Sequence, residues 1–235
     1  VMALLLWVIV RYNARANPEP SRFTHNTLVE VAWTVVPIAI LIVIAIPSFG
    51  VLSDQETMPD GTRVYLGSSI FSRSGGEVVP APGLTVKATG QQWFWSYEYA
   101  DADGVGFDSL LLDEQSRGEL KPGQPRLLAV DYELVVPVDT TVRVQITASD
   151  VLHAFAVPAF GIKVDAVPGR LSETWFYARK TGIYYGQCSE LCGKDHAFMP
   201  IAVRVVEQDE FANWFDTLKV DGDPDAANLE LATIE

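Results

Sequence analysis

The sequence predicts a membrane-anchored, all-β protein in which an N-terminal two-helix transmembrane hairpin precedes a Greek-key β-sandwich or barrel and one closing helix. Three observations support this: an uncharged apolar run near the start, several short segments that alternate with period two, and one helical face near the end. Hydrophobic residues make up 49% of the 235 residues, more than a soluble domain usually needs, so a membrane segment is expected.

Residues 28–52 form the predicted transmembrane helix. Glu30 is the one charged residue in this range. About 20 apolar residues are needed to cross the hydrocarbon core of a bilayer, and this run supplies them. Pro37 is expected to kink the helix, and Pro47 with Gly50 is expected to mark its exit.

Residues 1–10 are also apolar, but they are too short to span a membrane alone. We expect them to be the end of a first transmembrane helix, and the core of a signal peptide is the alternative. The linker 11–27 contains Arg11, Arg15 and Arg22 against the single acid Glu19, so the positive-inside rule places it in the cytoplasm and everything after residue 52 outside.

Glu30 has two interpretations. A carboxylate near the start of a membrane helix can simply reach the headgroup region. Ionisable groups at membrane depth are otherwise costly and tend to line proton or ion paths. The residues alone leave both open.

Residues 53–83 are rich in Gly, Pro and Ser and are predicted to be a linker. The period then changes to two, and residues 84–206 are predicted to form the β domain, with strands in segments 84–89, 126–132, 141–147, 172–178 and 201–206. Many short strands at this spacing indicate a sandwich or Greek-key barrel. Residues 207–235 are predicted to be a helix with an apolar face, followed by a loose acidic tail.

Soft metal ligands gather between residues 186 and 200. This stretch holds both cysteines of the chain, Cys188 and Cys192, together with His196 and Met199. The order from Cys192 to Met199 is that of a blue-copper ligand loop, and His153 supplies a second imidazole from an earlier segment. Because Cys188 adds a second thiolate, the pattern favours two bridging cysteines that hold two copper ions.

Two other sites fit the same residues. Paired cysteines in an external domain usually form a disulfide. A tetrahedral zinc site made by His153, Cys188, Cys192 and His196 is the second alternative. Neither explains Met199 or the order of the loop, so copper is favoured.

Several motifs together resemble subunit II of haem-copper cytochrome c oxidase. They are the stretch from Gly186 to Pro200, Asp150-Val-Leu-His153, the aromatic segment from Gly90 to Tyr99, and the segment from Gly161 to Arg170. The resemblance implies a cupredoxin-like barrel with a dinuclear CuA centre, which takes electrons from cytochrome c and passes them to haem in subunit I. That complex reduces oxygen to water and pumps protons. It also implies a multi-pass protein of the bacterial inner membrane with its copper domain in the periplasm.

The resemblance assigns a role to each matching residue. Cys188 and Cys192 would bridge the coppers; His153 with Met199 would complete one, and His196 with the Glu190 carbonyl the other. The Glu190 carboxylate would reach a Mg²⁺ ion at the interface with subunit I. Trp93 matches the tryptophan that receives electrons, and Glu30 matches the glutamate at the entrance of a proton channel. Phe94 stands where the family often has tyrosine.

The chain carries 30 acidic and 17 basic residues, a formal net charge of -13, which argues against nucleic-acid binding. By resemblance, cytochrome c would dock with its lysines on an acidic face near Trp93, comprising Glu98, Asp101, Asp113 and Glu114. The other expected partners are subunit I, further oxidase subunits and membrane lipid.

Other classes of protein remain alternatives. A quinol oxidase subunit II shares the hairpin and barrel but lacks the copper ligands. A nitrous oxide reductase has a similar loop but needs a histidine-rich second domain, and the chain has three histidines. A copper chaperone would hold its metal in an open, exchangeable site.

Overall fold

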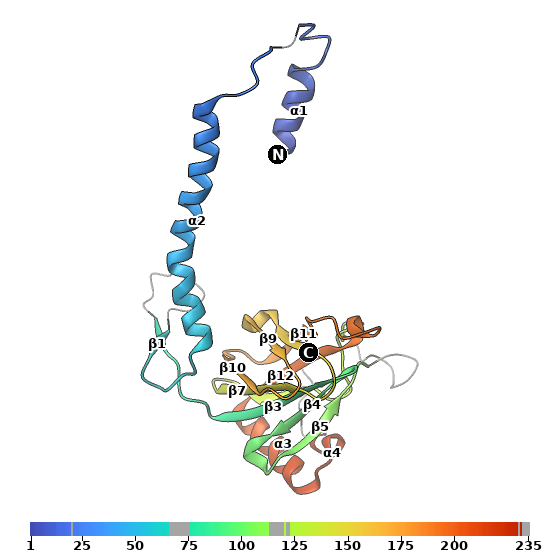
Figure 1. The fold of residues 1–235 in the computed structure, drawn as a ribbon. Helices are drawn as coiled ribbons and strands as arrows, with labels where there is room; N and C mark the ends of the chain where they lie inside the picture. The colour runs from blue at the N-terminus through green and yellow to red at the C-terminus, as the bar shows by residue number, and fades with distance from the viewer. Residues whose placement is uncertain (20, 66–75, 113–119, 121–122, 230, 232–235) are drawn as a thin grey trace. The chain divides into compact units, whose positions relative to one another are not determined.

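The computed structural model describes the chain except for residues 20, 66–75, 113–119, 121–122, 230 and 232–235. The described residues form two compact units, Val1–Ser48 and Phe49–Glu235. The first contains helix α1 and most of α2, and the second contains the strands and the last two helices (Figure 1).

The N-terminal helices are α1 (Met2–Arg11) and α2 (Thr27–Glu56). Among the described residues, α2 is the one helix long and apolar enough to cross a membrane, and α1 is apolar but shorter. No residue of either helix is buried. A helix that is apolar all round and unburied fits a membrane span. The predicted apolar helix is therefore confirmed, whereas the two-helix hairpin stays a prediction.

Helix α2 continues past the predicted exit at Pro47 and Gly50, to Glu56. Its last turn is polar and contacts the domain that follows. Asp54 pairs with Arg63 at 3.1 Å, and Gln55 Nε2 donates to the Gly161 carbonyl oxygen at 3.1 Å. The polar last turn of α2 is therefore held by contacts that hydropathy alone does not predict.

The described strands of the second unit form four sheets. The largest has the order β10-β7-β3-β4-β5, a second has the order β11-β12-β6, and β8 pairs with β9 and β1 with β2. The pairs β3 with β7 and β6 with β12 are parallel, and the others are antiparallel. The strands are β1 (Val64–Tyr65), β2 (Glu77–Val78), β3 (Leu84–Gln91), β4 (Phe94–Tyr99), β5 (Val105–Ser109), β6 (Leu134–Pro137), β7 (Thr141–Ala148), β8 (His153–Val157), β9 (Ile162–Ala166), β10 (Ser172–Tyr177), β11 (Gly182–Gln187) and β12 (Pro200–Val206), with short 3-10 turns η1 (Ala100–Ala102), η2 (Pro158–Phe160) and η3 (His196–Phe198).

The predicted strand at 126–132 was wrong. This segment forms turns, and its one β pairing among the described residues is an isolated bridge between Leu111 and Val130. Leu127 has a φ of 70°, and the Asp131 carboxylate accepts the backbone N–H of Leu110. A left-handed residue interrupts a regular strand, so alternation without turn chemistry misleads here.

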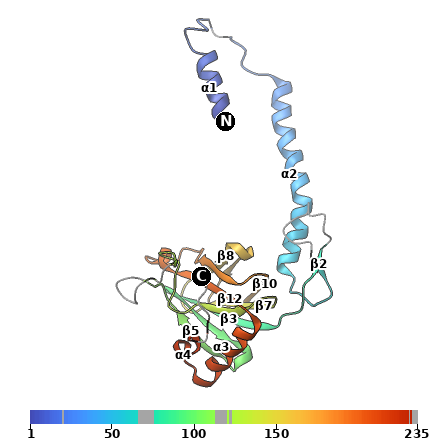
Figure 2. The same cartoon turned by 180° about the vertical axis from the view of Figure 1, so that it is seen from behind.

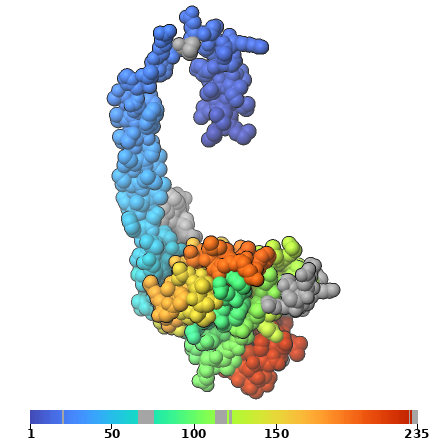
Figure 3. Space-filling view, turned by 45° about the vertical axis from the view of Figure 1, so that its right-hand side comes forward, coloured from blue at the N-terminus to red at the C-terminus, as the bar shows by residue number. Residues whose placement is uncertain are grey.

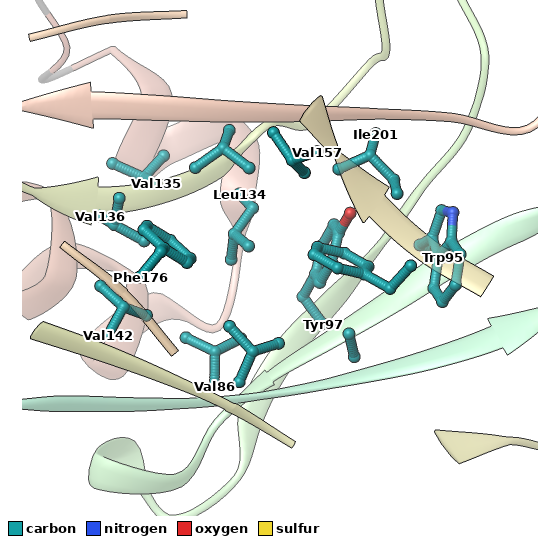
Figure 4. Packing of buried hydrophobic residues seen from close by; sticks show 14 of the residues in the cluster. Val86, Trp95, Tyr97, Leu134, Val135, Val136, Val142, Val157, Phe176 and Ile201 are labelled. Carbon is teal, nitrogen blue, oxygen red and sulfur yellow. The ribbon is translucent and has the colours of Figure 1, made fainter. Parts of the chain in front are cut away.

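The core lies between the two larger sheets (Figure 4). Val86 of β3 faces Val144 of β7 on one side and Tyr99 of β4 on the other, and all three are fully buried. Leu134 and Ile201 bring the β11-β12-β6 sheet into the same cluster. The ladders of the described strands remain separate sheets, so the closed Greek-key barrel is not confirmed.

Helix α3 (Gln208–Asp221) packs Trp214 and Leu218 against the core and ends at Gly222, whose φ of 64° suits glycine. Part of the predicted loose tail is helical instead, as α4 (Pro224–Asn228). Asp223 caps this helix by accepting the Asp225 N–H, and Trp214 Nε1 donates to Asn228 Oδ1 at 3.0 Å. Both helices lie at one end of the β domain (Figures 1 and 2).

Candidate metal centre

Two neighbouring strands and one loop position the predicted metal ligands. His153 begins β8, and Cys188 directly follows the end of β11. The two strands pass so closely that a Cβ on Gly186 would lie 2.1 Å from the Ala156 carbonyl oxygen. The loop that follows is closed at its base, where Cys188 N–H donates to the Met199 carbonyl oxygen at 2.9 Å.

Three predicted ligands converge in the interior of the domain. The ligand atoms of His153, Cys188 and Cys192 all lie within 4.8 Å of one another. Cys188 Sγ is 3.8 Å from His153 Nδ1 and 3.8 Å from Cys192 Sγ. The three side chains are at most 5% exposed. Two thiols and an imidazole buried at these separations would be stabilised, once the thiols lose their protons, by a cation bound between them.

The other predicted ligands border this group. His196 Nδ1 lies 3.6 Å from Cys192 Sγ, and the Cys188 thiol lies 3.4 Å from the Glu190 carbonyl oxygen. Met199 is fully buried, and its backbone is joined to Cys188. The Glu190 side chain is half-buried. The structure thus brings the predicted set together around one loop, while the metal-binding role of each residue stays a prediction.

The two cysteines are free thiols. Their sulfurs are 3.8 Å apart, whereas a disulfide bond is about 2.05 Å long. Burial, followed by the negative charge of Cys188, raises the pKa of the Cys192 thiol to about 12. A thiolate pair is therefore unfavourable here without a cation, and metal binding would release protons.

Asp150 holds the His153 ring. His153 Nε2 lies 2.9 Å from Asp150 Oδ1, which makes Nε2 the donor and leaves Nδ1 directed towards Cys188. Burial raises the pKa of Asp150, but hydrogen bonds from His153 and from the backbone N–H groups of Val151 and Gln92 outweigh it, so the pKa is lowered. A ligating histidine typically donates its second N–H to a carboxylate in this way.

The donor set fits a soft metal ion. With metal–sulfur bonds of about 2.3 Å, two thiolates on one ion can be up to about 4.6 Å apart, and the observed 3.8 Å falls within this limit. These distances suit zinc as well as copper. The buried thioether residue Met199 favours copper, because zinc sites use Cys, His, Asp and Glu, whereas a weak methionine ligand is typical of copper sites.

Trp93 lies at the turn between β3 and β4, half-buried against the core. Residues 188–199, which hold most of the predicted ligands, form the segment called the metal loop below. A Cβ added to Gly193 of this loop would lie 3.0 Å from the Trp93 ring, so ring and loop are in contact. Trp95 is fully buried and packs edge-on against Phe155, which makes it a core residue. Trp93 thus contacts the metal loop, whereas Trp95 lies edge-on to the His153 ring, with the ring centroids 6.1 Å apart.

Two of the predicted docking acids lie farther along the chain, Glu98 on β4 and Asp101 in η1. Glu98 pairs with Lys87 at 3.1 Å, and Asp101 accepts the Thr85 backbone N–H. Five residues of strand separate Glu98 from Trp93, about 16 Å. Asp113 and Glu114 lie outside the described residues. Sequence reasoning gave Asp150 no role, although it lies beside the metal loop; its position three residues before His153 was the one available signal.

Glu30 lies in the first turn of α2, where Glu30 Oε1 accepts the Asn26 backbone N–H at 3.1 Å. An acid at this position satisfies a free backbone donor and complements the helix dipole. This contact gives Glu30 a structural role, and the proton-channel role stays a prediction.

Comparisons with known proteins match both parts of the chain. The family model "Cytochrome C oxidase subunit II, periplasmic domain" matches residues 84–206, and "Cytochrome C oxidase subunit II, transmembrane domain" matches residues 1–51. A probable cytochrome c oxidase subunit 2 from Rickettsia bellii is 48% identical over 214 residues, which cover 91% of this chain and 71% of the relative. The match to the corresponding protein of Rickettsia felis covers 60% of the length of that protein.

Two solved structures are similar to the β domain. The periplasmic domain of subunit II of cytochrome oxidase from Bradyrhizobium japonicum is 61% identical with a TM-score of 0.56, covering 62% of this chain and 99% of that one. A mixed disulfide intermediate between a thioredoxin-like protein and subunit II of cytochrome c oxidase contains a chain that is 60% identical with a TM-score of 0.52, covering 62% of this chain and 96% of that one.

Proposed function

Because this chain belongs to the family of cytochrome c oxidase subunit II, we propose that it is the electron-receiving subunit of a respiratory oxidase. In this role it takes electrons from reduced cytochrome c at a dinuclear CuA centre and passes them to haem in subunit I. Oxygen reduction to water and proton pumping belong to the complex, and the isolated chain is an electron carrier.

The observation that carries this proposal is the convergence of His153, Cys188 and Cys192 within 4.8 Å of one another. Cys188 and Cys192 would bridge two coppers, His153 and Met199 would complete one, and His196 with the Glu190 carbonyl would complete the other. Bound copper supplies a one-electron redox couple. The chain supplies the rigid, largely buried enclosure that limits rearrangement and excludes water.

The finer architecture belongs to the same proposal. A two-helix transmembrane hairpin would place residues 11–27 in the cytoplasm of a bacterium and the cupredoxin-like Greek-key barrel, residues 84–206, in the periplasm. The protein would then be multi-pass in the inner membrane. The Glu190 carboxylate would contribute to a Mg²⁺ site facing subunit I, and Glu30 would lie at a proton-channel entrance.

A preparatory step follows from the free thiols. Copper can bind only if Cys188 and Cys192 are reduced, and adjacent cysteines in an oxidising compartment tend to pair. The solved mixed disulfide of a relative supports a thioredoxin-like protein as the class of partner that keeps this pair reduced.

Electron transfer from cytochrome c provides the test. We expect the second-order rate constant for reduction of the copper-loaded chain by reduced cytochrome c to fall as ionic strength rises, since exposed charges are screened beyond about 10 Å at 0.1 M salt. Glu98→Gln and Asp101→Asn should lower this rate constant. Asp216→Asn on α3, at the far end of the domain, is the matched control and should leave it unchanged. A rate independent of both salt and charge would contradict the proposal.

A further inference from the structure

We propose that Gln92 is a positioning residue that fastens the Trp93 turn to the metal loop and so sets the contact through which the electron crosses. This inference rests on the proposed function, because it assumes that Trp93 receives the electron. It concerns Gln92 and Gly193, to which the sequence motifs assign no role.

Gln92 makes two hydrogen bonds that join different parts of the site. Its side-chain Nε2 donates to the Cys192 carbonyl oxygen at 2.7 Å, and its backbone N–H donates to Asp150 Oδ2 at 2.7 Å. Asp150 in turn accepts from His153 Nε2 at 2.9 Å. A continuous set of hydrogen bonds therefore runs from the loop holding Cys192, through the β3–β4 turn, to the ring of His153.

Gly193 is where the turn touches the loop. A Cβ at this position would lie 3.0 Å from the Trp93 ring and 3.1 Å from Gln92 Nε2. Gly193 also has a φ of 128°, which side-chain-bearing residues rarely adopt. The absence of a side chain thus allows both the indole and the carboxamide to lie directly on the loop.

The Trp93 ring packs partly against the core but has few polar restraints. Its Nε1 is buried and has no hydrogen-bond partner among the residues that the structure describes. Lys194 Nζ lies 5.5 Å from the ring centroid, but the Lys194 side chain is 77% exposed and weakly restrained. The ring is therefore not fixed by a polar contact of its own. The Gln92 hydrogen bond next to it is the specific polar link between turn and loop.

The matched pair Gln92→Glu and Gln91→Glu tests this role. Glutamate keeps the size of glutamine but cannot donate to the Cys192 carbonyl. Gln91→Glu adds the same negative charge one residue away. In the unsubstituted chain, Gln91 Nε2 donates to Ser96 Oγ at 2.7 Å and not to the metal loop. The pair therefore separates the loss of the link from a change in surface charge.

The measurement is rapid mixing of reduced cytochrome c with the full chain loaded with copper in detergent. For Gln92→Glu we expect the limiting first-order rate at saturating cytochrome c to fall about tenfold, because misplacing a reacting group by about 1 Å can cost up to a hundredfold. The half-saturating cytochrome c concentration, the copper content and the EPR spectrum should match those of Gln91→Glu.

Equal limiting rates in the two variants, or a change confined to the half-saturating concentration, would overturn the proposal. Gly193→Ala is the second variant and should also lower the limiting rate, provided its thermal midpoint shows that it folds. If the unsubstituted chain bound copper but accepted no electrons from cytochrome c, the proposed function would fail, whatever Gln92 does.

Discussion

The two ends of the β domain use their buried groups differently. At one end lie the metal loop and β8, where thiols and an imidazole are buried beside one another. At the other end, α3 and α4 cover aromatic rings that pack against one another, with the ring centroids of Tyr99 and Trp214 5.5 Å apart. Figure 3 shows the surface around residues 175–200 on the side of the domain away from these helices. The metal end is organised for a ligand, and the helical end for stability.

The largest effect should come from removing a bridging thiol. We expect Cys188→Ser or Cys192→Ser to reduce the copper content of the chain from two ions to one or none, because a hydroxyl is a poor copper ligand. Metal analysis of the purified chain checks this. Thermal unfolding of the metal-free variants should differ little from that of the parent. Retention of two coppers by either variant would refute bridging.

Trp214→Ala should have the opposite profile. Trp214 is fully buried and also donates a hydrogen bond to Asn228, so its truncation should lower the free energy of unfolding by about 3–5 kcal/mol. Urea unfolding of the metal-free chain measures this loss. The copper spectrum of the folded variant should be unchanged. A cost below about 1 kcal/mol would mean that α3 contributes little to the core.

Two tyrosines on β4 sharpen the comparison within a single strand. Tyr99 Oη donates to the Val135 carbonyl oxygen at 2.8 Å and accepts from its N–H, whereas Tyr97 Oη is buried without a partner among the described residues. Tyr99→Phe should therefore cost about 1–3 kcal/mol, and Tyr97→Phe should be neutral or stabilising. Chemical denaturation of both variants gives the difference. Equal costs would contradict this hydrogen-bond assignment.

The smallest effect concerns an exposed ion pair on the outer face of the large sheet. Hydrogen bonds from Arg143 and Gln145 hold the pKa of Glu173 below its usual value. Because the unfolded state then binds more protons, this contribution is present above about pH 5 and is lost as the pH falls through the native pKa. At neutral pH it should be under about 1 kcal/mol, given the exposure of both partners.

Denaturation of Glu173→Gln between pH 3 and 7 tests the sign of this dependence. The stability of the variant should vary less with pH than that of the parent. A parent whose stability rises on acidification through this range would show the sign to be wrong.

Local patterns predicted the β domain unevenly. Period-two alternation identified β3, β7 and β10, because each has one face in the core and one outside, and it also identified β12, in which Arg204 is the one residue that is not buried. It missed β6 and β8, every residue of which is buried, because a uniformly apolar run lacks alternation. The apolar helix was predicted from its hydropathy, but its polar last turn contacts Arg63, which is close in sequence, and Gly161, which lies about a hundred residues further along the chain.

The candidate site was predictable as a set of residue types but not as an arrangement. The spacing within the loop predicts Cys188, Cys192 and His196 as ligands. His153 was inferred because the loop lacks a second imidazole. Neither Gln92 nor Asp150 had a predicted role, and the one signal for Asp150 was its position three residues before His153. Their roles follow from hydrogen bonds between segments that are far apart in sequence.

The EPR spectrum of the copper-loaded external domain tests the central claim most directly. The solved periplasmic domain of a relative supports expressing this part alone. If Cys188 and Cys192 bridge two coppers that share one unpaired electron, the oxidised domain should show seven hyperfine lines and contain two coppers per chain. A four-line spectrum from a single copper, or a domain that binds no copper, would contradict it.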